Sequence, residues 1–138
     1  METSSALPTG TLTFLFTDIE GSTRLLKALG REGYRELLEI HNRLIRSAIA
    51  GNEGVEVDRQ GDSFLAVFRS TGRAIVAAVE AQQALVEQGW PGGVQVRVRM
   101  GMHTGEAVLG EEGYIGVAVR EAARVGNAAE GGQIAQTT

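Results

Sequence analysis

The sequence predicts an α+β domain in which helices pack on one face of a mainly antiparallel sheet. A length of 138 residues with 43% hydrophobic residues fits one compact domain that buries its own core. Short segments alternate apolar and polar residues, as strands do, and longer segments between them place apolar residues on one helical face. The order is strand, helix, hairpin, helix, two strands and helix, for which a ferredoxin-like core is the nearest template.

A flexible leader and a buried strand are predicted at the start of the chain. Residues 1–10 are small and polar, so we expect the ordered domain to span residues 11–138. Within residues 11–17, a period of two that favours a strand is set by three large apolar residues and three threonines: Leu12, Phe14 and Phe16 alternate with Thr11, Thr13 and Thr17. This strand ends at Asp18 and therefore delivers an acidic side chain.

A long helix follows. Between Tyr34 and Ile49, apolar residues and His41 recur on one helical face, which indicates a helix that begins after Thr23. Gly51 is expected to end it.

A hairpin and a second helix come next. Strands are predicted around Val55 and Val57 and over residues 64–68, joined by the turn 59–62, so that Asp62 lies at the tip of the hairpin. Residues 75–86 then place apolar side chains on one face of a second helix.

The last third of the chain contains the most regular strand pattern. Residues 94–102 alternate strictly, with polar side chains on one face. A turn at residues 103–105 is expected to lead into another strand through Val108, followed by an alanine-rich helix over residues 117–129. A further strand is expected to start after Gly132.

Composition excludes several classes of function. The net charge of −4 argues against a nucleic-acid-binding protein, and the lack of cysteine removes disulfides, thiolate zinc sites and cysteine nucleophiles. No apolar run approaches the roughly 20 residues that span a bilayer, and the first residues do not resemble a signal peptide. We therefore expect a soluble cytoplasmic protein with no membrane partner, in which carboxylates carry any metal chemistry.

Two aspartates are candidate metal ligands. Adjacent strands could bring Asp18 and Asp62 to one edge of the sheet, where two carboxylates would suit a hard cation such as Mg²⁺. Just after Asp18, the backbone amides of residues 19–23 open a helix and could bind phosphate, with Gly21, Ser22 and Thr23 as the candidate residues. The alternative is that Asp18 and Ser22 are turn and N-cap residues and that Asp62 is an ordinary turn residue.

Four segments, taken in order, resemble the signature blocks of class III adenylyl and guanylyl cyclases. They are FTDIEGSTRL, VEVDRQGDSFLAVF, VRVRMGMHTGEAVLG and YIGVAVREAARV. The resemblance covers residues 12–133 and implies a ferredoxin-like domain that forms homodimers with composite active sites. The final strands that are usual in the family are missing from this sequence.

The resemblance implies a reaction and roles for particular residues. A nucleoside triphosphate, ATP or GTP, would be converted to its 3′,5′-cyclic monophosphate and pyrophosphate by two-metal catalysis. Asp18 and Asp62 match the metal-binding aspartates and the Ile19 carbonyl a backbone ligand, for two Mg²⁺ or Mn²⁺ ions per site. Arg124, contributed by the second protomer, matches the arginine that stabilises charge on the α-phosphate.

Three positions depart from the family pattern. Asp58 stands where adenylyl cyclases have a lysine that contacts adenine, and Gly113 stands where a second base-reading side chain is usual. Arg120 replaces the asparagine that orients the ribose, and it shares a helix face with Arg124. Asp58 is either a base contact of the guanylyl kind or an exposed acid at a strand end. The alternative function is a degenerate cyclase domain that binds metal and nucleotide, or dimerises, with little turnover.

Overall fold

The computed structural model describes residues 7–111 and 113–137. Residues 1–6, which form most of the predicted leader, lie outside the described residues. The elements of the described chain are, in order, β1 (Gly10–Ile19), α1 (Ser22–Gly51), β2 (Val55–Gln60), β3 (Ser63–Phe68), α2 (Thr71–Glu87), the short 3-10 turn η2 (Pro91–Gly93), β4 (Val98–Gly110), β5 (Gly113–Ile115), α3 (Val117–Ala128) and β6 (Ile134–Thr137).

The strands form one sheet in the order β2-β3-β1-β4-β5, and β6 also pairs with β4. Every pairing is antiparallel except that of β4 with β6. The succession β1-α1-β2-β3-α2-β4 and the strand order confirm the predicted α+β class with a ferredoxin-like core. The strand expected after Gly132 is β6.

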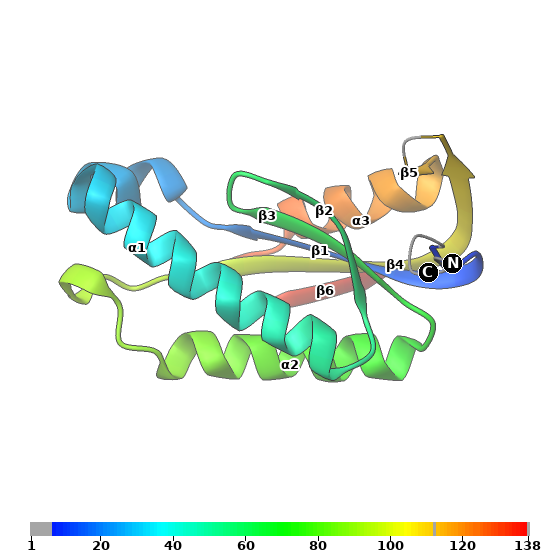
Figure 1. The fold of residues 1–138 in the computed structure, drawn as a ribbon, viewed down its shortest axis with the longest axis horizontal. Helices are drawn as coiled ribbons and strands as arrows, with labels where there is room; N and C mark the ends of the chain where they lie inside the picture. The colour runs from blue at the N-terminus through cyan, green and yellow to red at the C-terminus, as the bar shows by residue number, and fades with distance from the viewer. Residues whose placement is uncertain (1–6, 112, 138) are drawn as a thin grey trace, which may run out of the picture.

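The helices cover both faces of the sheet, which corrects the expectation of one covered face. α1 and α2 lie side by side over one face, and α3 lies over the other (Figure 1). The reason is visible in β1, where Leu15 and Ile19 are buried toward α1 and α2 while Leu12 and Phe14 are buried toward α3. A strand with large apolar side chains on both sides needs cover on both sides.

The strand β4 is displaced along the chain from its predicted position. Residues 94–97 alternate as a strand does, but they lie beyond the last β1 pair, Ile19 with Val98, and form no strand. The predicted turn at residues 103–105 is wrong, because these residues continue β4 and pair with residues 12–14 of β1. A paired neighbour therefore outweighs the turn preference of His103-Thr104-Gly105.

α1 is kinked rather than continuous. Gly30 has φ 77 and ψ 176, values outside the helical range, so the segment Ser22–Leu29 is set at an angle to the rest of the helix. The helix ends at Gly51 as predicted, and the Asn52 side chain donates to the Ala48 carbonyl (2.9 Å). None of the helices in the described ranges has the length and apolar character needed to cross a membrane.

Gly101 of β4 lets α3 approach the sheet closely. A Cβ atom at this position would collide with the backbone nitrogen and Cα of Gly126 on α3. Neither partner in this contact is a flexible side chain, so the helix itself would have to move.

We therefore expect Gly101→Ala to lower the free energy of unfolding by about 1–3 kcal/mol or more, as overpacking does. Urea denaturation monitored by circular dichroism measures the change. Gly51→Ala is the matched control, because nothing lies within 4 Å of a Cβ at that helical position. The control should be neutral or stabilising by about 0.5–1 kcal/mol. Equal effects of the two substitutions would contradict the close approach.

His41 is a fully buried histidine of α1. Its Nδ1 shares a hydrogen bond with Asn42 Oδ1 (2.8 Å), and its Nε2 has no partner among the described residues. Burial lowers the pKa of His41 below its usual value of 6.5, against smaller raising effects of Asn42 and Asp62. The folded protein therefore favours the neutral ring.

A depressed histidine pKa stabilises the fold fully above pH 6.5, and this contribution is lost as the pH falls toward the folded-state pKa. We expect the unfolding free energy to fall as the pH is lowered below about 6.5. The fall should be steeper than in His41→Gln by up to ~1.4 kcal/mol per pH unit. Denaturant titrations at several pH values measure this slope. The control His103→Gln leaves His41 in place and should show the same pH slope as the parent. Equal slopes for the parent and His41→Gln would show that His41 is not the source of the pH dependence.

Candidate functional site

The two predicted metal ligands come together at one end of the sheet. Asp18 is the penultimate residue of β1, and Asp62 follows Gly61 in the turn between β2 and β3. The Ile19 backbone N–H donates to Asp62 Oδ2 (2.9 Å), so the hairpin turn is tied to the residue next to Asp18. Gly61 has φ +59, a conformation that suits glycine and allows this tight turn.

Asp18 has a cationic partner that the sequence did not reveal. Arg99 donates to it twice, from Nε to Oδ1 (3.1 Å) and from Nη2 to Oδ2 (3.3 Å). Burial raises the pKa of Asp18, the Arg99 hydrogen bond and charge lower it, and the nearby Asp62 charge raises it. The polar face of residues 94–102 offered a signal for Arg99, but its partner follows only from the strand register.

The donor set suits a hard divalent cation. Asp18 and Asp62 are carboxylates close enough to affect one another electrostatically, and Ile19 adds a carbonyl oxygen to the same segment. Across the described ranges, no group of three or more histidine, aspartate and glutamate side chains could enclose an ion. An ion that takes one or two carboxylates and completes its shell with water and phosphate, as Mg²⁺ does, fits this arrangement.

The segment predicted to bind phosphate is the N-terminus of α1. Gly21 is the N-cap, with φ 68, and among the described residues no side-chain hydrogen bond caps the start of the helix. Ser22 and Thr23 are the first helical residues, so the alternative that Ser22 is the N-cap is wrong. The open amides follow Asp18 by only a few residues, and the candidate cation and phosphate sites are therefore contiguous.

Asp58 lies beside a small cavity, and Gly113 lies elsewhere. The cavity has a volume of about 150 Å³ between β2, β3 and α3, and its lining includes Phe16, Leu65 and Val119. The Asp58 carboxylate accepts from the Arg59 backbone N–H (2.8 Å). Across the paired strands, Asp58 is level with Gly101 of β4. Gly113 pairs with Gly110, which lies nine residues farther along β4. One protomer thus does not bring the two predicted base-specifying positions together.

Arg120 and Arg124 lie on the outer side of α3. The Arg124 side chain is 68% exposed and forms an ion pair with Glu121, one turn earlier. The hydrogen bond from Arg124, with smaller effects that include the charge of Arg120, lowers the pKa of Glu121. The acid needed to offset two arginines on one helix face is therefore Glu121. No contact in the described chain joins either arginine to Asp18 or Asp62.

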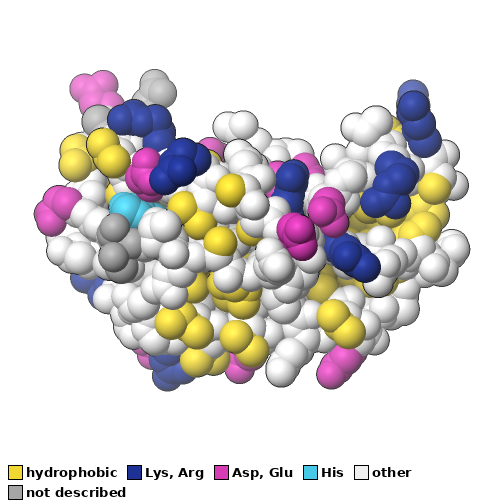
Figure 2. Space-filling model, turned by 180° about the vertical axis from the view of Figure 1, so that it is seen from behind, with side chains coloured by type: hydrophobic (Ala, Val, Ile, Leu, Met, Phe, Trp, Pro, Cys, Tyr) yellow, Lys and Arg dark blue, Asp and Glu magenta, His cyan; other side chains and the backbone are white. Residues whose placement is uncertain are grey.

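The face of the molecule opposite to that of Figure 1 carries acidic and basic side chains close together in its upper half (Figure 2).

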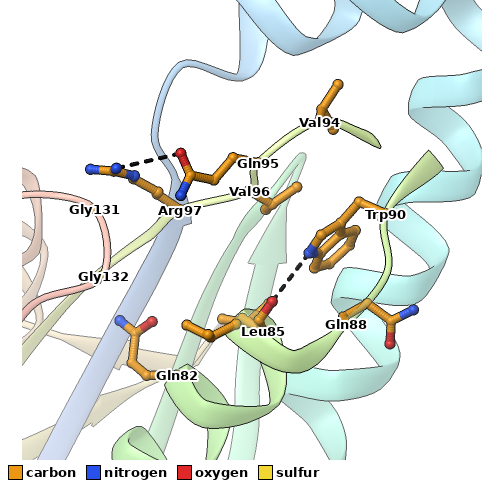
Figure 3. Close-up of a pocket in the computed structure, with 11 residues that line it drawn as sticks. Gln82, Leu85, Gln88, Trp90, Val94, Gln95, Val96, Arg97, Gly131 and Gly132 are labelled. Carbon is orange, nitrogen blue, oxygen red and sulfur yellow. Dashed lines mark hydrogen bonds between the residues drawn. The ribbon is translucent and has the colours of Figure 1, made fainter. Parts of the chain in front are cut away.

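A larger cavity, of about 380 Å³, lies apart from the aspartates, beside the end of α2 and the segment 94–97. Its wall includes Trp90, whose indole N–H donates to the Leu85 carbonyl (3.1 Å; Figure 3). None of the predicted site residues lines it.

Both the sequence and the fold of this chain are similar to those of known proteins. The family described as the adenylate and guanylate cyclase catalytic domain matches residues 5–138. Adenylate cyclase of Mycosarcoma maydis is 32% identical over an alignment of 154 positions, which covers 94% of this chain and 6% of the relative. A Mycobacterium tuberculosis protein is 32% identical over 136 residues, which cover 97% of this chain and 45% of the relative. The chain thus spans less than half the length of these relatives.

Solved structures agree. A structure of Trypanosoma brucei adenylate cyclases in their monomeric state superposes with a TM-score of 0.83 and 30% identity, covering 95% of this chain and 74% of that chain. The sequence match extends over nearly the whole chain, and the fold match includes the sheet that carries Asp18 and Asp62. The chain belongs to the adenylate and guanylate cyclase catalytic domain family.

Proposed function

We propose that this domain converts a nucleoside triphosphate to its 3′,5′-cyclic monophosphate and pyrophosphate. The observation that carries the proposal is the meeting of Asp18 and Asp62, linked through the Ile19 amide, beside the open N-terminus of α1. Family membership and the similarity to adenylate cyclases support the reaction class.

Each group has a distinct task in this proposal. Asp18, Asp62 and the Ile19 carbonyl hold two Mg²⁺ or Mn²⁺ ions, which when bound lower the barrier to attack by the ribose 3′-hydroxyl and neutralise the triphosphate. The amides of residues 21–23 bind phosphate oxygens. Arg124 stabilises the charge that develops on the α-phosphate, for which a rigid and permanently charged guanidinium is suited.

The active site is proposed to form between two copies of the chain. Within one protomer, Arg124 is exposed and pairs with Glu121 instead of approaching the aspartates. Exposed apolar residues of β4 and α3, among them Val108 (49%), Leu109 (39%) and Val117 (62%), support a protein-covered surface on this part of the fold. A homodimer would supply Arg124 from the partner and give two sites related by symmetry.

The base is proposed to enter the cavity beside Asp58. Its lining combines Phe16, Leu65 and Val119 with the polar Asp58 and Gln60 at the edge. A carboxylate accepts hydrogen bonds, so Asp58 matches the N1 and N2 donors of guanine better than the edge of adenine. GTP is therefore expected to be used at least as well as ATP, with limited discrimination because Gly113 offers no side chain.

A second candidate is a degenerate domain that binds metal and nucleotide, or dimerises, with little turnover. The separation of Asp58 from Gly113 and the exposed cation at position 120 favour it. Both departures affect base and ribose placement, whereas the aspartates are retained.

The direct test is incubation with ATP and, separately, GTP in Mn²⁺, with cyclic nucleotide measured by chromatography. We expect product from the parent chain and a loss of at least about a hundredfold in Asp62→Asn, which removes a charged ligand of the metal. The control should keep its fold by circular dichroism. Equal product from Asp62→Asn would exclude this site, and no product from a folded dimer of the parent would favour the degenerate domain.

The composite site is tested by mixing two inactive variants. Asp62→Asn and Arg124→Ala should each be inactive alone, because every site in each homodimer lacks one group. After exchange of subunits, mixed dimers hold one intact site, so activity should return to about a quarter of the parent value. Absence of recovery from chains shown to exchange would contradict an Arg124 supplied by the partner.

A further inference from the structure

The carboxylate of Asp18 is already engaged by a cation of the chain itself. Arg99 contacts both carboxylate oxygens, at 3.1 and 3.3 Å. The two residues lie directly opposite one another in the β1–β4 register, so the backbone of two paired strands holds them together. A bidentate pair of this kind is among the stronger hydrogen-bonded arrangements of a carboxylate.

We propose that Arg99 is an internal counter-ion that a divalent cation must displace from Asp18, so that this arginine weakens cation binding to the nucleotide-free protein. The inference rests on the proposed metal site. The side chains of Asp18 and Arg99 are only 18% and 29% exposed, so water screens their charges incompletely. A guanidinium bound to both oxygens repels a divalent cation. It also occupies the carboxylate lone pairs through which that cation would bind.

Removal of Arg99 should change cation binding in opposite directions if Arg99 positions Asp18 and if it competes with the cation for Asp18. If Arg99 served only to position Asp18, its removal would loosen the carboxylate and weaken cation binding. If Arg99 competes, its removal frees both oxygens and leaves Asp18 beside Asp62 without a counter-charge, and cation binding becomes tighter.

Arg97, which precedes the start of β4, provides a matched control for the loss of a positive charge. It lies two residues before Arg99, just outside β4, and its Nη2 donates to the neutral Gln95 Oε1 (3.4 Å). Arg97→Gln removes the same charge from nearly the same place without touching Asp18. Any general effect of net charge on cation binding would appear equally in both variants.

The experiment titrates Mn²⁺ alone into the nucleotide-free chain and measures free Mn²⁺ by electron paramagnetic resonance. We expect Arg99→Gln to lower the dissociation constant about three- to tenfold, Arg97→Gln to change it by less than about twofold, and Asp18→Asn to weaken binding strongly. Arg99→Lys keeps the charge but loses the bidentate contact, and it should fall between the parent and Arg99→Gln.

The outcomes also separate this inference from the metal site on which it rests. Weaker or unchanged binding in Arg99→Gln, or equal shifts in Arg99→Gln and Arg97→Gln, would overturn the competition while leaving the metal site intact. Unchanged binding in Asp18→Asn would remove the metal site and the inference together. If Arg99→Gln fails to fold, Arg99→Lys compared with Arg97→Lys decides the question by the same signs.

Discussion

The antiparallel pairing of β1 with β4 is the interaction on which the rest of the structure depends. It runs from Gly10 opposite Ala107 to Ile19 opposite Val98 and forms the centre of the sheet. β3 joins the free edge of β1, while β5 and β6 join β4. Because side chains alternate along a strand, the same register sends Leu15 toward α1 and α2 and Phe14 toward α3, and so determines where all three helices pack.

The register also sets the electrostatics of the candidate site. Asp18 lies near the end of β1, opposite Arg99 on β4 and beside the hairpin turn that contains Asp62. Burial and the second carboxylate make ionised Asp18 less favourable, and Arg99 offsets part of this cost. Neighbouring carboxylates held in this way are typical of cation-binding sites, because two acids placed together contribute little favourable free energy to folding by themselves.

Local patterns predicted the parts of the fold that local forces control. The acid at the end of β1, the Gly61-Asp62 turn and the end of α1 at Gly51 all follow from short-range preferences. The start of β4 did not, because residues 94–97 have a strand pattern but no partner strand, and residues 103–105 have a turn pattern but pair with β1. Arg99 was missed for the same reason, since it is 81 residues from Asp18 and meets it only through the register.

The proposed function requires that Asp18 and Asp62 form one cation site at the end of β1. Crystals grown with Mn²⁺ and a non-hydrolysable nucleoside triphosphate, measured near the manganese absorption edge, locate bound ions directly by their anomalous scattering. We expect anomalous density between the two carboxylates, close to the Ile19 carbonyl and the amides of residues 21–23. Density confined to other surfaces, with both aspartates free of manganese, would contradict it.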